Sequence, residues 1–266
     1  MATELLARAD PARRFGGLAR LYGHSGARAL SRAHAVVVGL GGVGSWAAEA
    51  LARSGVARLT LIDLDHIAES NINRQVHALE LTLGQAKVQA MRERIGQIHP
   101  DCQVRCVEDF VSDNNWPHIA DLHLDSDQPL AVIDACDQIA AKVAMAAWAL
   151  RSKALFISVG AAGGKRHAHR VDVADLSQVT HDPLLAKLRY GLRKHQGAPR
   201  EGLMRLACVY SPEAVMKPAS VCEADSDEQV DGTLNCHGYG SVVSVTSTFG
   251  LCAAGWVLDS IARKWG

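Results

Sequence analysis

Carboxylate, amide and guanidinium side chains follow a short apolar segment near residue 60, where they could hold a nucleotide. The stretch LTLIDLDHIAESNINRQ contains Asp63, Asp65, Asn71, Asn73, Arg74 and Gln75. A carboxylate at the end of a strand can accept hydrogen bonds from ribose hydroxyls. An arginine adds positive charge for phosphate, which a plain dinucleotide site does not need. The pattern therefore indicates a nucleotide site with an additional contact to phosphate.

A glycine-rich loop precedes these residues, between an apolar strand-like run and a helix-like run. The loop in VVVGLGGVGSW contains Gly39, Gly41, Gly42 and Gly44. Glycines allow a sharp turn and let phosphate approach the N-terminal amides of the following helix, where the helix dipole favours an anion. Asp63 lies about 20 residues further on, as in adenosine-binding sites. The alternative is a tight strand-to-helix turn without a ligand.

These residues require a scaffold of alternating strands and helices. Hydrophobic periodicity predicts strands at 35–39, 58–63, 103–108, 130–134 and 154–159, and helices at 43–53, 84–98 and 138–151. This alternation is typical of an α/β fold with a Rossmann-like, doubly wound, mostly parallel sheet. We expect one domain, residues 1–266, with a nucleotide-binding core over 1–160. A C-terminal elaboration at 161–235 contains a further strand and an amphipathic helix, and 236–266 packs on the core.

Composition limits the possible settings of the protein. The 266 residues are 48% hydrophobic, which is enough for a large core. Lys+Arg and Asp+Glu both number 28, so any contact with nucleic acid must come from a local basic patch. Seven cysteines without a C-x-x-C pair indicate neither a disulfide framework nor a zinc site, which favours the cytoplasm.

The two ends of the chain raise the question of targeting. The start, MATELLARADPARRF, carries acids and lacks a continuous apolar segment, so we do not expect a secretory signal. Residues 238–258 are uncharged and long enough for a membrane span, but Ser, Thr and Gly recur through them. We expect this segment to be core and predict no stable membrane insertion.

Five motifs give the chain a family resemblance. They are GLGGVG (39–44), LIDLD (61–65), NINRQ (71–75), GQAKV (84–88) and DACDQ (134–138). Together they resemble the ubiquitin-activating-enzyme-like ThiF/MoeB superfamily, whose members adenylate carboxylates. A narrower similarity to the tRNA threonylcarbamoyladenosine dehydratases rests on RFGGLARLYG (14–23), GAAGG (160–164), DPLLAKLR (182–189), VYSPE (209–213) and NCHGYGSVVSVTSTFG (235–250).

The resemblance implies ATP as the nucleotide and Mg²⁺ as its metal ion. It implies that Arg74 and Lys87 contact the phosphates, that Asp63 holds the ribose and that Asp137 binds Mg²⁺. Such cations suit the reaction, because attack of a carboxylate on the α-phosphorus builds charge on phosphate oxygens. Asp134 could assist or could have a structural role at the strand end. On sequence alone, Lys87 could also lie on a solvated helix face.

The resemblance further implies a homodimer in which an N-terminal arginine enters the partner's site. Arg14 and Arg20 are the candidates, because Gly17 replaces the second arginine of the superfamily pattern. Members that pass an acyl group to a thiol need a cysteine, for which Cys236 is the first candidate and Cys208 the second, with core packing as the alternative. A cysteine desulfurase system is a further candidate partner.

Three classes of function follow. The favoured one is ATP-dependent, cyclising dehydration of threonylcarbamoyladenosine in tRNA, with the basic runs 165–170 and 187–195 either holding tRNA phosphates or simply solvated. The second is adenylation of the C-terminus of a ubiquitin-like sulfur carrier, which the missing C-x-x-C pairs disfavour. The third is an NAD(P)-dependent oxidoreductase or a nucleotide sensor. Arg74, Lys87 and Asp137 disfavour it, because hydride transfer does not need a triphosphate-binding set of charges.

Overall fold

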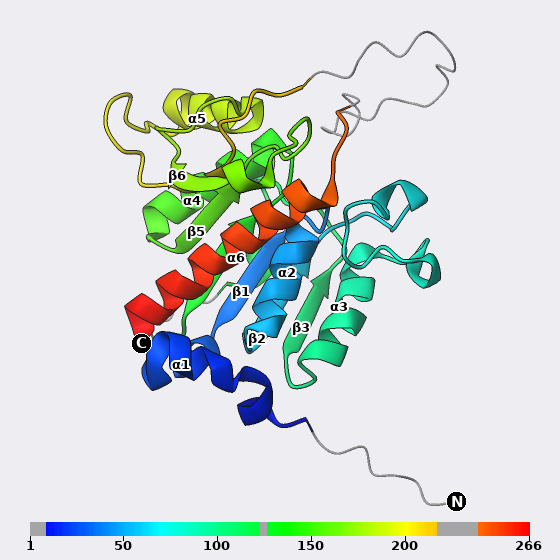
Figure 1. The fold of residues 1–266 in the computed structure, drawn as a ribbon. Helices are drawn as coiled ribbons and strands as arrows, with labels where there is room; N and C mark the ends of the chain where they lie inside the picture. The colour runs from blue at the N-terminus through cyan, green and yellow to red at the C-terminus, as the bar shows by residue number, and fades with distance from the viewer. Residues whose placement is uncertain (1–8, 123–126, 217–238) are drawn as a thin grey trace, which may run out of the picture.

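The computed structural model describes residues 9–122, 127–216 and 239–266 (Figure 1). Within these residues, seven strands form one sheet in the order β3-β2-β1-β4-β5-β7-β6. All neighbouring pairs are parallel except β6 and β7, which are antiparallel. The strands are β1 (His34–Val38), β2 (Arg58–Ile62), β3 (Gln103–Val107), β4 (Leu130–Asp134), β5 (Leu155–Val159), β6 (Asp172–Asp175) and β7 (Ala207–Tyr210).

Helices cover both faces of the sheet. They are α1 (Pro11–Leu30), α2 (Gly44–Arg53), α3 (Lys87–Ile98), α4 (Ile139–Ser152), α5 (Pro183–His195) and α6 (Val243–Trp265). Alternate residues of β1 divide between the two layers, because successive side chains of a strand point to opposite faces. Ala35 and Val37 pack with α2, α3 and α6, whereas Val36 and Val38 pack with α4 and α5. Burial of every residue of β1 explains its continuous apolar run.

The structure confirms the predicted α/β fold and shifts some element boundaries. The helix predicted from residue 84 begins at Lys87, because Gly84 adopts a positive φ of 80° and Ala86 is the extended N-cap. Helix α1 was not predicted, although Asp10 followed by Pro11 is a standard helix start. The division at residues 160 and 235 stays a prediction.

Helix α6 contains the apolar C-terminal segment and runs across one face of the sheet beside α2 (Figure 1). Phe249, Ala253, Val257 and Ile261 recur every four residues and are fully buried, so they form one helix face. By length and hydropathy α6 could cross a membrane, but half of its most apolar window is buried inside the protein. Packing on α2 and the sheet therefore accounts for this apolar composition.

The order of the strands creates a crevice between β1 and β4. Helix α2, which follows β1, covers one face of the sheet, and α4, which follows β4, covers the other. The two chain segments therefore diverge at the carboxyl ends of these neighbouring strands. In open α/β sheets, ligands bind at such a switch point.

Candidate active site

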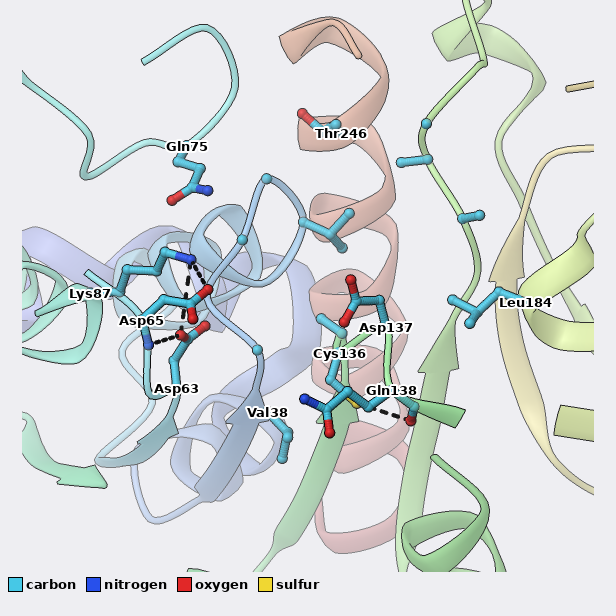
Figure 2. Close-up of a pocket in the computed structure, with 18 of the residues that line it drawn as sticks. Val38, Asp63, Asp65, Gln75, Lys87, Cys136, Asp137, Gln138, Leu184 and Thr246 are labelled. Atoms are coloured by element: carbon cyan, nitrogen blue, oxygen red, sulfur yellow. Dashed lines mark hydrogen bonds and ion pairs between the residues drawn. The ribbon is translucent and has the colours of Figure 1, made fainter. Parts of the chain in front are cut away.

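A cavity of about 680 Å³ opens at the carboxyl ends of the parallel strands (Figure 2). Its walls come from the glycine loop, the end of β2, residues 65–75, the start of α3, the β4–α4 loop, the loop after β5, and the starts of α5 and α6. Lys87, Asp63 and Gln75 lie on one side in Figure 2, and Asp137 and Leu184 lie on the other. The cavity thus lies at the switch point of the sheet, with Lys87 and Asp63 on one side and the Asp137 carboxylate on the other.

The glycine loop forms one wall through close backbone packing. Gly39 has a positive φ of 85°, and a Cβ there would lie 2.9 Å from the backbone of Ala135. A Cβ on Gly44 would overlap the carbonyl oxygen of Gly39, whereas one on Gly41 would meet no atom within 4 Å. Helix α2 begins at Gly44, and its N-cap residue Val43 makes no side-chain cap. The first amides of α2 are therefore suited to hold a phosphate.

Lys87 is buried between two carboxylates at the end of β2 (Figure 2). Its Nζ lies 2.6 Å from Asp65 Oδ2 and 4.0 Å from Asp63 Oδ1. The Asp63 carboxylate also accepts from the amides of Leu40, at 2.5 Å, and Asp65, at 2.9 Å. Burial raises the pKa of Asp63, while Lys87 and the two amides oppose that rise. The alternative that Lys87 lies on a solvated helix face is therefore wrong.

Arg74 packs directly on the glycine loop. Its side chain lies so close to Gly42 that a Cβ there would be 3.1 Å from Arg74 Cγ. The NH1 group donates to the carbonyl of Ser70 and, at 2.9 Å, to Asn73 Oδ1. Burial lowers the pKa of Arg74. A guanidinium carries five donor hydrogens, so these two bonds at NH1 leave the capacity to bind a phosphate in the cavity.

The amide side chains of the NINRQ segment have three different surroundings. Asn71 is buried and accepts from the amide of Ala68 at 3.2 Å, which closes the turn before Arg74. Asn73 donates to the carbonyl of Ser241 at 3.2 Å and so connects the segment to the approach of α6. Gln75 is buried against the cavity, and its Oε1 has no hydrogen-bond partner within the described residues. Gln75 therefore offers a buried acceptor to a ligand.

Asp134 and Lys142 form a fully buried ion pair beneath the β4–α4 loop. Lys142 Nζ lies 2.9 Å from Asp134 Oδ2 and 2.8 Å from the Val159 carbonyl. Ser158 Oγ donates to the same carboxylate at 2.6 Å, and Cys136 Sγ at 3.2 Å. These contacts favour the structural role for Asp134. Burial and the neighbouring Asp134 raise the pKa of the Cys136 thiol well above its ordinary range, which disfavours the nucleophilic thiolate.

Asp137 follows Cys136 in the chain and lines the cavity (Figure 2). Among the residues that the structure describes, no group of three or more His, Cys, Asp or Glu could hold a metal ion. A metal at Asp137 would therefore take most of its ligands from phosphate oxygens and water. Mg²⁺ binds in this manner, through one or two carboxylates plus substrate phosphates, so the surroundings of Asp137 fit Mg²⁺.

Arg14 and Arg20 lie away from the cavity of their own chain. Arg14 donates to the carbonyl of Ile98 at 2.6 Å, at the end of α3 opposite to Lys87. A helix of 12 residues separates these ends by roughly 17 Å. Arg20 is exposed on α1. Neither arginine lines the cavity of its own chain.

Of the two candidate cysteines, the described part of the chain contains Cys208. Cys236 lies outside the described residues. Cys208 is fully buried in β7, and burial strongly raises the pKa of its thiol. Core packing is therefore the role that the structure gives Cys208.

Sequence reasoning did not assign several residues that line the cavity. Residues 160–163 lie beside it, as do Lys187 on α5 and Thr246 on α6. A signal for the first group was present, since GAAGG follows a predicted strand and the carboxyl ends of parallel strands share one edge of the sheet. The positions of α5 and α6 depend on tertiary packing.

Comparison with known proteins agrees with this arrangement. The model of the ThiF family matches residues 15–264. The chain belongs to the ThiF family. It is 40% identical over 257 residues to the tRNA threonylcarbamoyladenosine dehydratase of Escherichia coli (strain K12), covering 94% of each chain. The enzyme of that name from Haemophilus influenzae is 38% identical over 268 residues, covering 99% of each chain.

A solved structure extends the similarity of this ThiF-family chain to three dimensions. The structure of the E. coli tRNA N6-threonylcarbamoyladenosine dehydratase in complex with ATP matches with a TM-score of 0.83 and 39% sequence identity. The match covers 95% of both chains. The similarity thus includes the core, the elaboration around α5 and helix α6.

Proposed function

We propose that this ThiF-family protein is an ATP-dependent tRNA threonylcarbamoyladenosine dehydratase, acting in the cytoplasm. The observation that carries the proposal is the cavity at the switch point, where a phosphate-binding loop, Lys87, Arg74 and Asp137 meet. Similarity over nearly the full length to dehydratases, one of them solved with ATP, supports this substrate.

The reaction has two steps. First, an oxygen of the threonyl carboxylate attacks the α-phosphorus of ATP, and pyrophosphate leaves. Second, a nitrogen or oxygen of the carbamoyl group attacks the activated acyl carbon, and AMP leaves with one former carboxylate oxygen. A ring closes as a proton is released, so the nucleoside loses the elements of water.

The residues of the cavity match the charges that develop in the first step. The amides at the start of α2 and the cations of Arg74 and Lys87 would stabilise the phosphate oxygens of the transition state. Asp63, fixed by the amides of Leu40 and Asp65, would accept hydrogen bonds from the ribose hydroxyls. Asp137 would hold Mg²⁺, which when bound would neutralise charge on the phosphates.

One incubation tests the proposal. The protein is mixed with ATP, Mg²⁺ and threonylcarbamoylated tRNA, and the tRNA is digested for nucleoside mass measurement. Loss of one water from the modified nucleoside, with AMP and pyrophosphate formed, is the expected result. An unchanged nucleoside, with ATP consumed only when a sulfur-carrier protein is added, would identify the protein as a carrier activator instead.

Removal of Mg²⁺ is expected to abolish activity, and Asp137→Ala should mimic that loss by lowering turnover about 10²-fold or more. The reason is that the charge on the phosphates would lose its counter-ion. Turnover is measured with EDTA and again after Mg²⁺ is restored, with Asp113→Ala, which removes an exposed carboxylate, as the control. Elemental analysis should find no stoichiometric zinc. About one zinc per chain, or wild-type turnover in Asp137→Ala, would contradict this assignment.

We also propose a homodimer in which Arg14 or Arg20 serves the partner's cavity. An Arg14→Ala, Arg20→Ala double variant and a Lys87→Ala variant should each be inactive but should recover activity when mixed. At random exchange about half the dimers are mixed and each has one complete site, so about a quarter of wild-type activity is the ceiling. If the dimers exchange subunits but no activity is recovered, the arginines do not act in the partner's cavity. Their role would then lie within their own chain, where Arg14 donates to the carbonyl of Ile98.

A further inference from the structure

The basic run on α5 separates into two sets of side chains. Arg189 donates through NH1 to the carbonyls of Leu176, at 2.9 Å, and Val179, at 3.0 Å. Arg193 donates to the carbonyls of Pro199, at 3.1 Å, and Arg200, at 3.0 Å. Both guanidinium groups therefore bind neighbouring loops to α5, whereas the other basic residues of the run, Lys187, Lys194 and His195, are exposed.

The second set consists of Lys187, Tyr190 and Lys194, which we call the α5 ridge. Their spacing of three and four residues places them on one face of the helix. All three are exposed, with Tyr190 at 63%, and Lys194 Nζ lies 5.6 Å from the centroid of the Tyr190 ring. The opposite face of α5 is buried through Leu184, Leu185, Leu188 and Leu192. The ridge is thus a row of two cations and an aromatic ring along one helix face, about 10 Å long.

The ridge begins at the rim of the cavity. Lys187 lines the cavity together with Pro183 and Leu184, while Tyr190 and Lys194 continue along the helix beyond it. Residues 183–195 contain four Lys or Arg residues and no acid, in a chain whose formal net charge is zero with His neutral. Positive charge is therefore concentrated on an element that leads out of the proposed catalytic cavity.

We propose that the α5 ridge binds the RNA strand next to the nucleotide whose carboxylate enters the cavity. This inference rests on the proposed function. Lys187 and Lys194 would pair with backbone phosphates, and Tyr190 would stack on a neighbouring unpaired base. An open strand edge or an apolar groove is a common site for a protein tail, and the ridge instead offers lysines and a single ring on a helix. Its chemistry therefore fits RNA better than a sulfur-carrier protein.

The experiment measures the affinity of wild-type protein and ridge variants for threonylcarbamoylated tRNA at several salt concentrations. Tyr190→Ala should weaken binding about 10-fold without changing the salt dependence, and Tyr190→Phe should restore it because stacking is retained. Lys187→Ala and Lys194→Ala should each weaken binding and lower the slope of log K against log salt by about 0.7 to 1. Tyr190→Ala and Lys194→Ala should leave ATP affinity unchanged, since neither residue lines the cavity.

The control is an Arg28→Ala, Arg32→Ala double variant, which removes two exposed cations at the end of α1. Its tRNA affinity and salt slope should equal those of wild type. If the ridge variants bind tRNA as tightly as wild type, or if they lose binding to a sulfur-carrier protein while RNA binding stays intact, the ridge does not bind RNA. Either result would leave the proposed function untouched, provided that wild type still converts the nucleoside. If the ridge variants bind RNA more weakly but wild type does not convert the nucleoside, the ridge is an RNA-binding surface and the proposed function is wrong.

Discussion

Replacing Lys87 or Arg74 by alanine is expected to lower the rate of cyclising dehydration by about 10²-fold or more. Both cations lie where charge would develop on the phosphates of ATP. Lys87 is already desolvated between Asp63 and Asp65, and Arg74 lies against Gly42 of the phosphate loop. A cation fixed before the reaction stabilises the transition state without reorganisation. Each loss should therefore exceed what removal of a solvated charge would cause.

The measurement separates the adenylation step from the overall reaction. Exchange of pyrophosphate into ATP reports adenylation, and nucleoside mass reports ring closure, so both should fall in parallel for Lys87→Ala and Arg74→Ala. Arg92→Ala is the matched control, because Arg92 is an exposed cation on the same helix as Lys87. Circular dichroism should show that the variants remain folded. Wild-type turnover in either variant would remove that residue from the proposed site.

The sequence was sufficient for the parts of the site that lie at the ends of strands. The glycine loop, Asp63 and Asp137 each follow a strand of the parallel sheet, and the shared edge brings their segments together at one cavity. Lys87 was assigned through family resemblance, because a lysine at the start of a polar helix has no local sign of burial. A turn at Gly84 precedes Lys87 and its contacts with Asp63 and Asp65, and the periodicity did not indicate that turn.

Other features could not be predicted because they depend on which helix face is covered. Arg189 and Lys194 are both long basic residues of the run 187–195, and the sequence does not distinguish them. In the structure Arg189 donates to loop carbonyls, whereas Lys194 is exposed. Lys142 in IAAKVAMAAWAL resembles a solvated lysine of an apolar helix. Its side chain is instead fully buried beneath β4 and β5. Long basic side chains are thus buried in one place and exposed in another, and tertiary packing decides which.

Lys142→Met is expected to lower the free energy of unfolding by about 3–5 kcal/mol, the cost of leaving a buried charge without its partner. Although burial acts to lower the pKa of Lys142, the Asp134 carboxylate holds it above its ordinary value, so the lysine is charged. Methionine would fill similar space but, among the described residues, would leave the Asp134 carboxylate with hydrogen bonds from Ser158 and Cys136 alone. Chemical denaturation measures the change. Lys187→Met, at an exposed position, should alter stability by less than about 0.5 kcal/mol.

A double-variant cycle shows whether the destabilisation arises from the uncompensated carboxylate. Asp134→Asn alone leaves Lys142 charged and buried, so it should also destabilise the fold. Combining it with Lys142→Met removes both charges, and the amide can still accept from Ser158, so the double variant should be more stable than Lys142→Met alone. Additive losses would instead mean that Lys142 acts mainly through its bonds to Ser158 and the Val159 carbonyl. In that case β5 and the loop after it, rather than Asp134, would be the partners that require a buried lysine.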